Sequence, residues 1–102
     1  MKKKFIVVIP ARYNSSRLPG KPLIKILGVP MLIRTYKQCL KVVSRDKIFI
    51  ATDDKRIQKL CDDNNMNCVM TSKKCLTGTD RIAELSKKIK ASFYINIQGD
   101  EP

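Results

Sequence analysis

Short apolar runs that can form buried strands alternate along this chain with longer segments whose apolar residues recur at helical spacing. Such alternation is typical of a parallel sheet covered by helices on both faces, because each crossover between parallel strands needs a helix-sized segment. The runs predict four strands, at residues 5–9, 47–51, 68–70 and 92–97. The segments between them predict three helices, which begin near Pro30, Asp53 and Thr79.

The expected order of the strands across the sheet is 3-2-1-4, with the first strand in the centre. Crossovers are right-handed, so the chain reverses its direction of travel across the sheet beside the first strand. Ligands of open parallel sheets bind outside the carboxyl ends of the strands at this switch point. We therefore expect a three-layer, mostly parallel, Rossmann-like α/β fold in which residues 10–22 and 98–102 meet.

Capping and turn residues suggest where the helices begin and end. Asp53 is expected to cap the second helix, which ends at Asn64 and Asn65, and Thr79 to cap the third. A short hairpin is expected to turn at residues 27–28. The apolar residues expected to face the sheet are Leu32, Ile33, Tyr36, Leu40 and Val43 in the first helix, Ile57, Leu60 and Cys61 in the second, and Ile82, Leu85 and Ile89 in the third.

A cationic loop, residues 10–22, follows the first strand and carries Arg12, Arg17 and Lys21. Ser15 adds a neutral donor, and Gly20 permits backbone geometry that other residues resist. A loop of this kind at the carboxyl end of a strand predicts a cradle for a polyanion such as a nucleoside triphosphate. The alternative interpretation is a solvated basic loop, since charged loops are ordinary at protein surfaces.

The sequence Gln-Gly-Asp-Glu-Pro follows the fourth strand directly, at residues 98–102. A carboxylate at a strand end that faces a phosphate cradle can hold Mg²⁺ on a nucleotide, and Asp100 is the candidate ligand. The alternative interpretation of Asp100 is a turn-forming or capping residue.

Composition narrows the possible functions. The net charge of +12 comes mostly from lysines spread along the chain, which favours a lysine-rich surface with an anion site over a nucleic-acid-binding face. The absence of histidine excludes Ser-His-Asp and Cys-His catalysis. The four cysteines form no Cys-x-x-Cys pair, so we expect reduced structural thiols without zinc. No apolar run is long enough to span a membrane, and we expect a cytoplasmic protein.

Four segments carry a resemblance to a known family. Residues 9–23, Ile-Pro-Ala-Arg-Tyr-Asn-Ser-Ser-Arg-Leu-Pro-Gly-Lys-Pro-Leu, resemble the signature loop of sugar-acid cytidylyltransferases. Residues 51–54, 77–81 and 96–102 fit the same family in the same order. Within it, the chain resembles the 3-deoxy-manno-octulosonate cytidylyltransferases (CMP-KDO synthetases) more than the acylneuraminate cytidylyltransferases, whose loop is richer in glycine.

The resemblance implies a nucleotidyltransferase domain of glycosyltransferase-A-like fold, of which residues 1–102 form the amino-terminal, nucleotide-binding part. It implies that CTP activates 3-deoxy-manno-octulosonate (KDO) to CMP-KDO for lipopolysaccharide biosynthesis, with release of pyrophosphate and with Mg²⁺ as cofactor. The implied catalytic residues are Arg12, Lys21 and Asp100, and Asp100 is also the implied metal ligand. The implied CTP-binding residues are Ala11, Arg12, Ser15, Arg17, Lys21, Gly78 and Thr79, and the implied substrate-binding residues are Arg81 and Gln98.

Members of the resembled family continue well beyond the Gly-Asp-Glu-Pro motif. They carry there a further metal-binding aspartate, the rest of the sugar pocket and the part that forms a homodimer. The resemblance therefore implies a homodimer for the full-length form, or a complementing chain for a shorter one. Two alternatives remain open: a non-catalytic or split nucleotide-binding fragment of such an enzyme, and a cytidylyltransferase for a related sugar acid.

Overall fold

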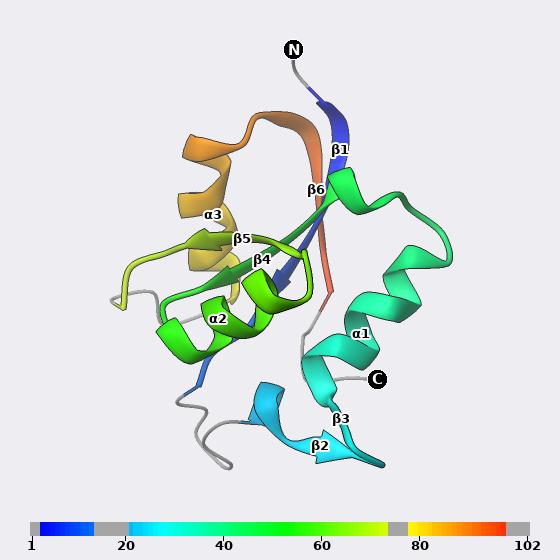
Figure 1. Cartoon of the computed structure of the whole chain (residues 1–102). Coiled ribbons are helices and arrows are strands. Elements are labelled where there is room, and N and C mark those ends of the chain that lie inside the picture. Colours follow the sequence, from blue (N-terminus) through cyan, green and yellow to red (C-terminus); the bar gives the residue numbers. More distant parts are fainter. Residues whose placement is uncertain (1–2, 14–20, 74–77, 98–102) are drawn as a thin grey trace.

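The computed structural model describes residues 3–13, 21–73 and 78–97, which form a sheet flanked by helices (Figure 1). Four parallel strands make up the sheet in the order β5-β4-β1-β6. Their bounds are Lys3–Pro10 for β1, Ile48–Thr52 for β4, Asn67–Met70 for β5 and Ala91–Asn96 for β6. The predicted order is confirmed, because these are the four predicted strands and the first of them lies in the interior of the sheet.

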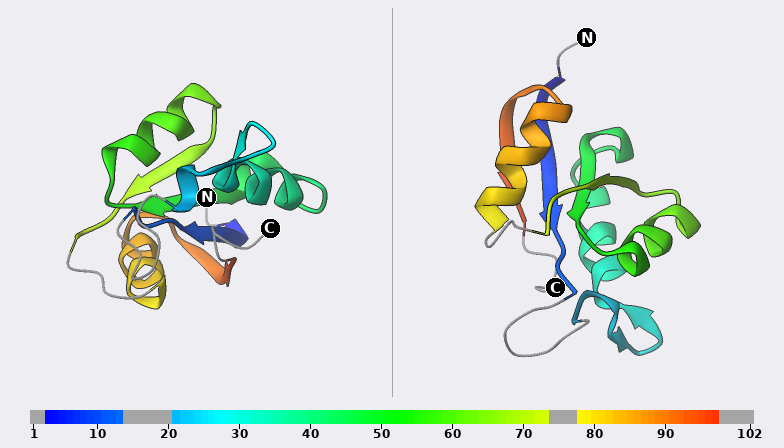
Figure 2. Two further views of the ribbon diagram at one scale, coloured as in Figure 1. Left: turned by 90° about the horizontal axis from the view of Figure 1, so that it is seen from below. Right: turned by 90° about the vertical axis from the view of Figure 1, so that its left-hand side faces the viewer.

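Three helices cover the two faces of the sheet. Figure 2 shows α1 (Met31–Leu40) and α2 (Lys55–Asp63) on one face and α3 (Gly78–Lys88) on the other. Strand β1 is therefore buried on both faces, which explains its continuous apolar run. Within the described ranges, no helix is both long enough and apolar enough to pass through a membrane.

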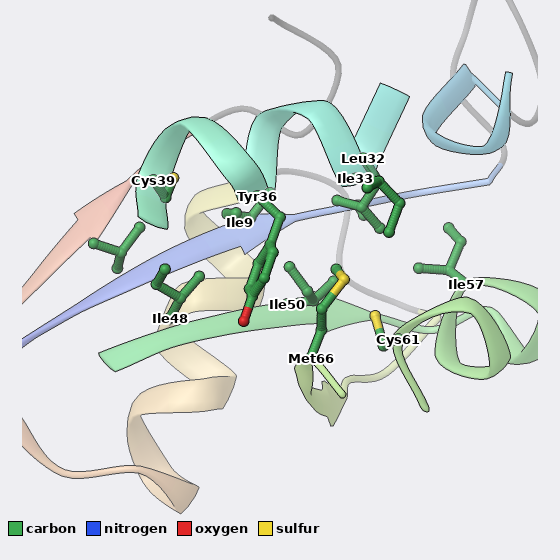
Figure 3. Packing of buried hydrophobic residues seen from close by; sticks show 12 residues of the cluster. Ile9, Leu32, Ile33, Tyr36, Cys39, Ile48, Ile50, Ile57, Cys61 and Met66 are labelled. Atoms are coloured by element: carbon green, nitrogen blue, oxygen red, sulfur yellow. The ribbon is translucent and has the colours of Figure 1, made fainter. Parts of the chain in front are cut away.

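The first hydrophobic cluster lies between the sheet and the pair α1 and α2 (Figure 3). Leu32, Ile33 and Tyr36 of α1 are buried in it as predicted, and the Tyr36 side chain extends from the helix toward β4. Leu40 was expected to face the sheet but is 38% exposed, and Cys39, one position earlier, is buried instead. The apolar face of α1 is therefore rotated slightly from the predicted one at the end of the helix.

The second hydrophobic cluster lies under α3 on the opposite face. Leu85 is fully buried there against side chains of β1 and β4 such as Val8 and Ala51. Ile82 and Ile89 pack against the same cluster and are partly buried. The predicted inward face of the third helix is thus confirmed.

The segment between β1 and α1 contains the predicted hairpin. After the short 3-10 helix η1 (Lys21–Leu23), the strands β2 (Lys25–Ile26) and β3 (Val29–Pro30) pair antiparallel. Leu27 and Gly28 form the turn with φ of 53° and 82°, the positive values that tight hairpins of this kind require. The side chain of Arg34 in α1 donates to the carbonyl of Ile26, which fastens the hairpin to the helix.

Two helix starts differ from the prediction, α2 by one residue and α3 by two. Asp54, and not Asp53, caps α2, because its Oδ1 accepts a hydrogen bond of 2.8 Å from the amide of Arg56. Helix α3 begins at Gly78, so Thr79 lies inside the first turn instead of capping it. At α2 the neighbouring aspartate offered an equally good local signal.

Strand β6 forms one edge of the sheet in the described part of the chain. Tyr94 faces α3, and its hydroxyl donates to the carbonyl of Ile89 (2.7 Å) and accepts from the amide of Ala91 (3.0 Å). On the opposite face Phe93 is 64% exposed and Ile95 is 45% exposed. The apolar alternation predicted for this strand is therefore present, with one of its faces largely uncovered.

Candidate functional site

Backbone hydrogen bonds fix the carboxyl end of β1 from both sides. The amide of Ala11 donates to the carbonyl of Ala51 after the ladder with β4 (2.9 Å), and the amide of Ile97 donates to the carbonyl of Val8 (2.9 Å). Ala11 is only 2% exposed, and Arg12, the next residue, is partly buried. The cationic loop therefore starts from a fixed point at the switch between β4 and β6, where parallel sheets bind ligands.

A second fixed point follows at Tyr13. The guanidinium of Arg56 lies 3.3 Å from the centre of the Tyr13 ring, a cation–π contact. The same guanidinium donates to both carboxylate oxygens of Asp54, at 3.1 Å and 2.7 Å. The hydrogen bond from Arg56 lowers the pKa of Asp54 and raises the pKa of Arg56. Tyr13 is thus held against the amino end of α2, which sets the direction of the chain as the cationic loop begins.

The far end of the cationic loop returns to the same edge. Lys21 opens η1, and the amide of Met31 at the start of α1 donates to the carbonyl of Ile24 at 2.9 Å. Figure 1 shows η1 beyond the carboxyl end of β1, close to the start of α1. Ser15 and Arg17, two predicted CTP-binding residues, lie outside the described residues.

The end of β6 reaches this edge as well. Asn96 is opposite Val8 of β1 in the register of the sheet, and Ile97 continues the pairing by one hydrogen bond. The predicted substrate-binding residue Gln98 and the predicted metal ligand Asp100 follow directly in the sequence but lie outside the described residues. The described chain therefore brings the entrances of both predicted loops together, at the central strand of the sheet.

The first turn of α3 carries the remaining predicted site residues. Gly78 opens the helix, and Thr79 is exposed. Arg81, predicted to bind the substrate, is 1% exposed. Its guanidinium donates to Asp53 Oδ2 at 3.2 Å and to Thr71 Oγ1 at 2.7 Å. These two contacts of Arg81 are internal ones, to residues that follow β4 and β5.

Sequence reasoning did not predict the ion pairs of these two networks. Asp53 was expected to cap the second helix, and neither Asp53 nor Asp54 was expected to pair with an arginine. Arg56 carried a usable signal, since an arginine two positions after a capping aspartate can fold back onto it. Thr71 carried no signal, because its contact with Arg81 depends on how α3 lies across the sheet.

The described cysteines are free thiols buried to different degrees. Burial raises the pKa of Cys39, and a hydrogen bond with Cys68 together with burial raises the pKa of Cys61. The raised pKa values make Cys39 and Cys61 poor nucleophiles and poor metal ligands at neutral pH, whereas the hydrogen bond with Cys61 lowers the pKa of Cys68. Among the residues that the structure describes, no three His, Cys, Asp or Glu side chains are grouped so that they could hold a metal ion.

Comparison with known proteins gives consistent results. The sequence profile of the family described as Cytidylyltransferase matches residues 6–102. The 3-deoxy-manno-octulosonate cytidylyltransferase of Escherichia coli is 46% identical over 99 residues, which are 97% of this chain and 40% of that protein. The mitochondrial 3-deoxy-manno-octulosonate cytidylyltransferase of Arabidopsis thaliana is 43% identical over 99% of this chain and 36% of its own length. The chain thus spans about 40% of the length of these relatives.

A solved structure leads to the same family. CMP:2-keto-3-deoxy-manno-octonic acid synthetase, in a structure complexed with CTP, matches 98% of this chain with a TM-score of 0.91 and 45% sequence identity, over 42% of its own length. This likeness in fold extends the likeness in sequence, and both confirm the resemblance drawn from the four motif segments. Because the family profile covers nearly all of the sequence, the chain belongs to the cytidylyltransferase family.

Proposed function

We propose that this chain is the CTP-binding part of a cytidylyltransferase that transfers CMP from CTP to KDO, with release of pyrophosphate, for lipopolysaccharide biosynthesis. The relatives named 3-deoxy-manno-octulosonate cytidylyltransferase and the likeness to a synthetase complexed with CTP support this substrate pair. The observation that carries the proposal is that the start of the cationic loop and the end of β6 lie together at the carboxyl edge of the sheet. Ala11 bonds to Ala51 there, and Ile97, which precedes residues 98–102, bonds to Val8 of β1.

The cationic loop would hold the triphosphate. Arg12, Arg17 and Lys21 would contact the phosphates and offset the negative charge that builds up on departing pyrophosphate. Backbone groups of Ala11 and the hydroxyl of Ser15 would add neutral contacts. The amide of Ala11 already donates to the carbonyl of Ala51, so Ala11 would contribute its carbonyl, which the buried backbone holds in a fixed orientation.

The sugar acid and the base would bind on either side of the triphosphate. Gln98 would hydrogen-bond the sugar, and Gly78 and Thr79 would contact the nucleotide from the first turn of α3. The anomeric hydroxyl of KDO attacks the α-phosphorus of CTP, and the bond to pyrophosphate breaks in line with it. Orientation and charge neutralisation account for such catalysis without a side-chain nucleophile, which agrees with the absence of histidine.

Asp100 would hold Mg²⁺ on the nucleotide. Mg²⁺ is usually bound by one or two carboxylates while substrate phosphates and water supply the other oxygens, so one aspartate beside a triphosphate is a fitting donor set. When bound, Mg²⁺ neutralises phosphate charge and lowers the pKa of the attacking hydroxyl. The part of Arg12 and Lys21 in this arrangement is to orient the phosphate oxygens that face the aspartate.

Calorimetric titration of the chain with CTP tests the binding proposal. Arg12→Ala and Lys21→Ala should each weaken binding by about 1.5–3 kcal/mol, the usual value for a hydrogen bond to a charged group. Lys87→Ala is a matched control, because Lys87 is an exposed lysine in the last turn of α3. Equal CTP affinity in all four proteins would contradict the proposal.

Activity needs a separate assay, since the chain spans about 40% of the length of its relatives. Pyrophosphate release is measured with CTP and either KDO or an acylneuraminate, first with the 102-residue chain and then with the chain joined to the remaining length of a relative. KDO-dependent release that Asp100→Asn abolishes without a change in melting temperature supports the full proposal. CTP binding without pyrophosphate release would support the second candidate, a nucleotide-binding part without turnover.

A further inference from the structure

One side of α3 carries a row of polar side chains that contact the end of β5 and the two residues after it. Arg81 reaches Thr71 and, at 3.5 Å, the carbonyl of Ser72. Glu84, one turn further, accepts a hydrogen bond of 2.8 Å from the amide of Ser72. Lys88, one more turn along, donates to the carbonyl of Met70 at 2.8 Å. We call this row of Arg81, Glu84 and Lys88 the polar seam of α3.

Arg81 is the buried member of the polar seam and joins three elements. Its side chain is 2% exposed and pairs with Asp53, which directly follows β4 and is 19% exposed. Thr71, its other partner, directly follows β5 and donates its amide to the carbonyl of Thr52 on β4 at 2.8 Å. One guanidinium therefore ties the start of α3 to the carboxyl ends of two neighbouring strands.

Apolar packing alone does not fix where α3 lies along the sheet. Among its described side chains, Leu85 is the one apolar residue that is fully buried, while Ile82 contacts the same cluster from a half-buried position. Apolar contacts are non-directional, so they resist separation of the helix from the sheet more than sliding or rotation over it. Hydrogen bonds and ion pairs are directional, and those of Arg81 act at the turn that contains Gly78 and Thr79.

We propose that Arg81 is a positioning residue, not a substrate-binding one: it holds the first turn of α3 at the carboxyl edge of the sheet, where Gly78 and Thr79 face the nucleotide. This inference rests on the proposed CTP site and gives Arg81 a different part in it. A guanidinium that is 2% exposed and bonds to Asp53 and Thr71 through two of its nitrogens offers almost no surface to a sugar acid. Its effect on binding passes through the residues that it orients.

Hydrogen exchange and CTP titration on the same variants test the inference. The amides of residues 82–85 bond to the carbonyls of residues 78–81 in a regular helix, so they report whether the first turn is held in place. In Arg81→Gln these amides should exchange faster without any nucleotide, and the Kd for CTP should rise about tenfold. Arg81→Lys, which keeps the charge opposite Asp53, should restore part of both properties.

Two further variants complete the test, one as a control and one as a second probe of the Arg81 contacts. Lys87→Gln removes an exposed charge from the same helix and should leave the exchange and the Kd unchanged. Thr71→Val removes one acceptor of Arg81 and leaves the ion pair, so it tests the tie even if Arg81→Gln does not fold. Titrations are run well below each melting temperature, so that all of the protein is folded.

The outcomes separate this inference from the proposed function. Weaker CTP binding with unchanged exchange would mean that Arg81 touches the ligand, and would overturn the inference. Faster exchange with unchanged CTP affinity would mean a structural role alone, and would also overturn it. A wild-type chain that binds no CTP would overturn the proposed function, and the positioning role with it, while the exchange rates alone would still decide whether Arg81 fixes the turn.

Discussion

Asp53 and Asp54 are neighbours in the sequence, and each pairs with an arginine, but the two ion pairs lie in different surroundings. Arg81 and Asp53 are 2% and 19% exposed and their charged atoms are 3.2 Å apart. Arg56 and Asp54 are 58% and 14% exposed, with a shorter contact of 2.7 Å. The shorter contact belongs to the pair that water reaches more easily, so distance alone is a poor guide to what each pair contributes.

The two pairs also differ in what they connect. Arg56 lies two positions from Asp54, so their contact organises one helix turn and the stacked Tyr13. Arg81 lies 28 positions from Asp53, and their contact joins α3 to the sheet. Exposed pairs gain little because water screens them, whereas breaking a buried pair leaves a charge without solvation. The comparison therefore predicts that replacing Asp53 lowers the unfolding free energy strongly and that replacing Asp54 lowers it only a little.

The largest effect is expected from Asp53→Ala. This change leaves the more deeply buried partner, the guanidinium of Arg81, without its carboxylate, and breaking a buried pair in this way costs about 3 kcal/mol or more. Urea denaturation followed by circular dichroism measures the loss in unfolding free energy. A loss no larger than that of Asp54→Ala would contradict the claim that the buried pair contributes more than the exposed pair.

Arg81→Met should lower the unfolding free energy by about 2 kcal/mol, less than Asp53→Ala does. The carboxylate left behind is 19% exposed and can recover hydration, and methionine fills the space of the arginine stem. The double variant completes a mutant cycle. Its loss in unfolding free energy should be clearly smaller than the sum of the losses of the two single variants. Strict additivity would show that the pair has no coupling energy.

Asp54→Ala should cost about 1 kcal/mol, a typical value for losing an N-cap side chain. The affected hydrogen bond runs from the amide of Arg56 to the Asp54 carboxylate. Asp54→Asn and Asp54→Ser keep an acceptor and should restore most of the loss, which thermal denaturation can measure. If neither restored it, the capping role assigned to Asp54 would be wrong.

At neutral pH, Arg56→Gln is expected to cause the smallest loss in unfolding free energy of these variants. The difference between this variant and wild type should shrink as the pH falls. The hydrogen bond from Arg56 lowers the pKa of folded Asp54, so the unfolded chain binds this proton more readily. The resulting stabilisation is present above the unfolded pKa, near 4, and is lost as the pH falls through the lower folded value. Denaturation between pH 7 and pH 2 should show a smaller acid-side loss for Arg56→Gln than for wild type.

Much of the fold could be predicted because it depends on local patterns. The apolar run of β1 predicts a strand that is buried on both faces, and the turn at Leu27 and Gly28 is a short-range signal. The choice between Asp53 and Asp54 as the helix cap depends on which carboxylate is taken by a distant arginine, and the sequence does not show that pairing. Arg12 and Lys21 were expected at the edge of the sheet, and their parts of the backbone lie there, while their roles stay predictions.

The interior position of β1 has a consequence for how the chain folds during synthesis. The ribosome makes β1 first, but its partner β4 follows about 40 residues later and its partner β6 about 80 residues later. At about 5–20 residues per second, β1 waits roughly 4–16 s for its second neighbour. A strand that is covered on both faces in the folded protein thus waits longest for its neighbours while the chain is being made.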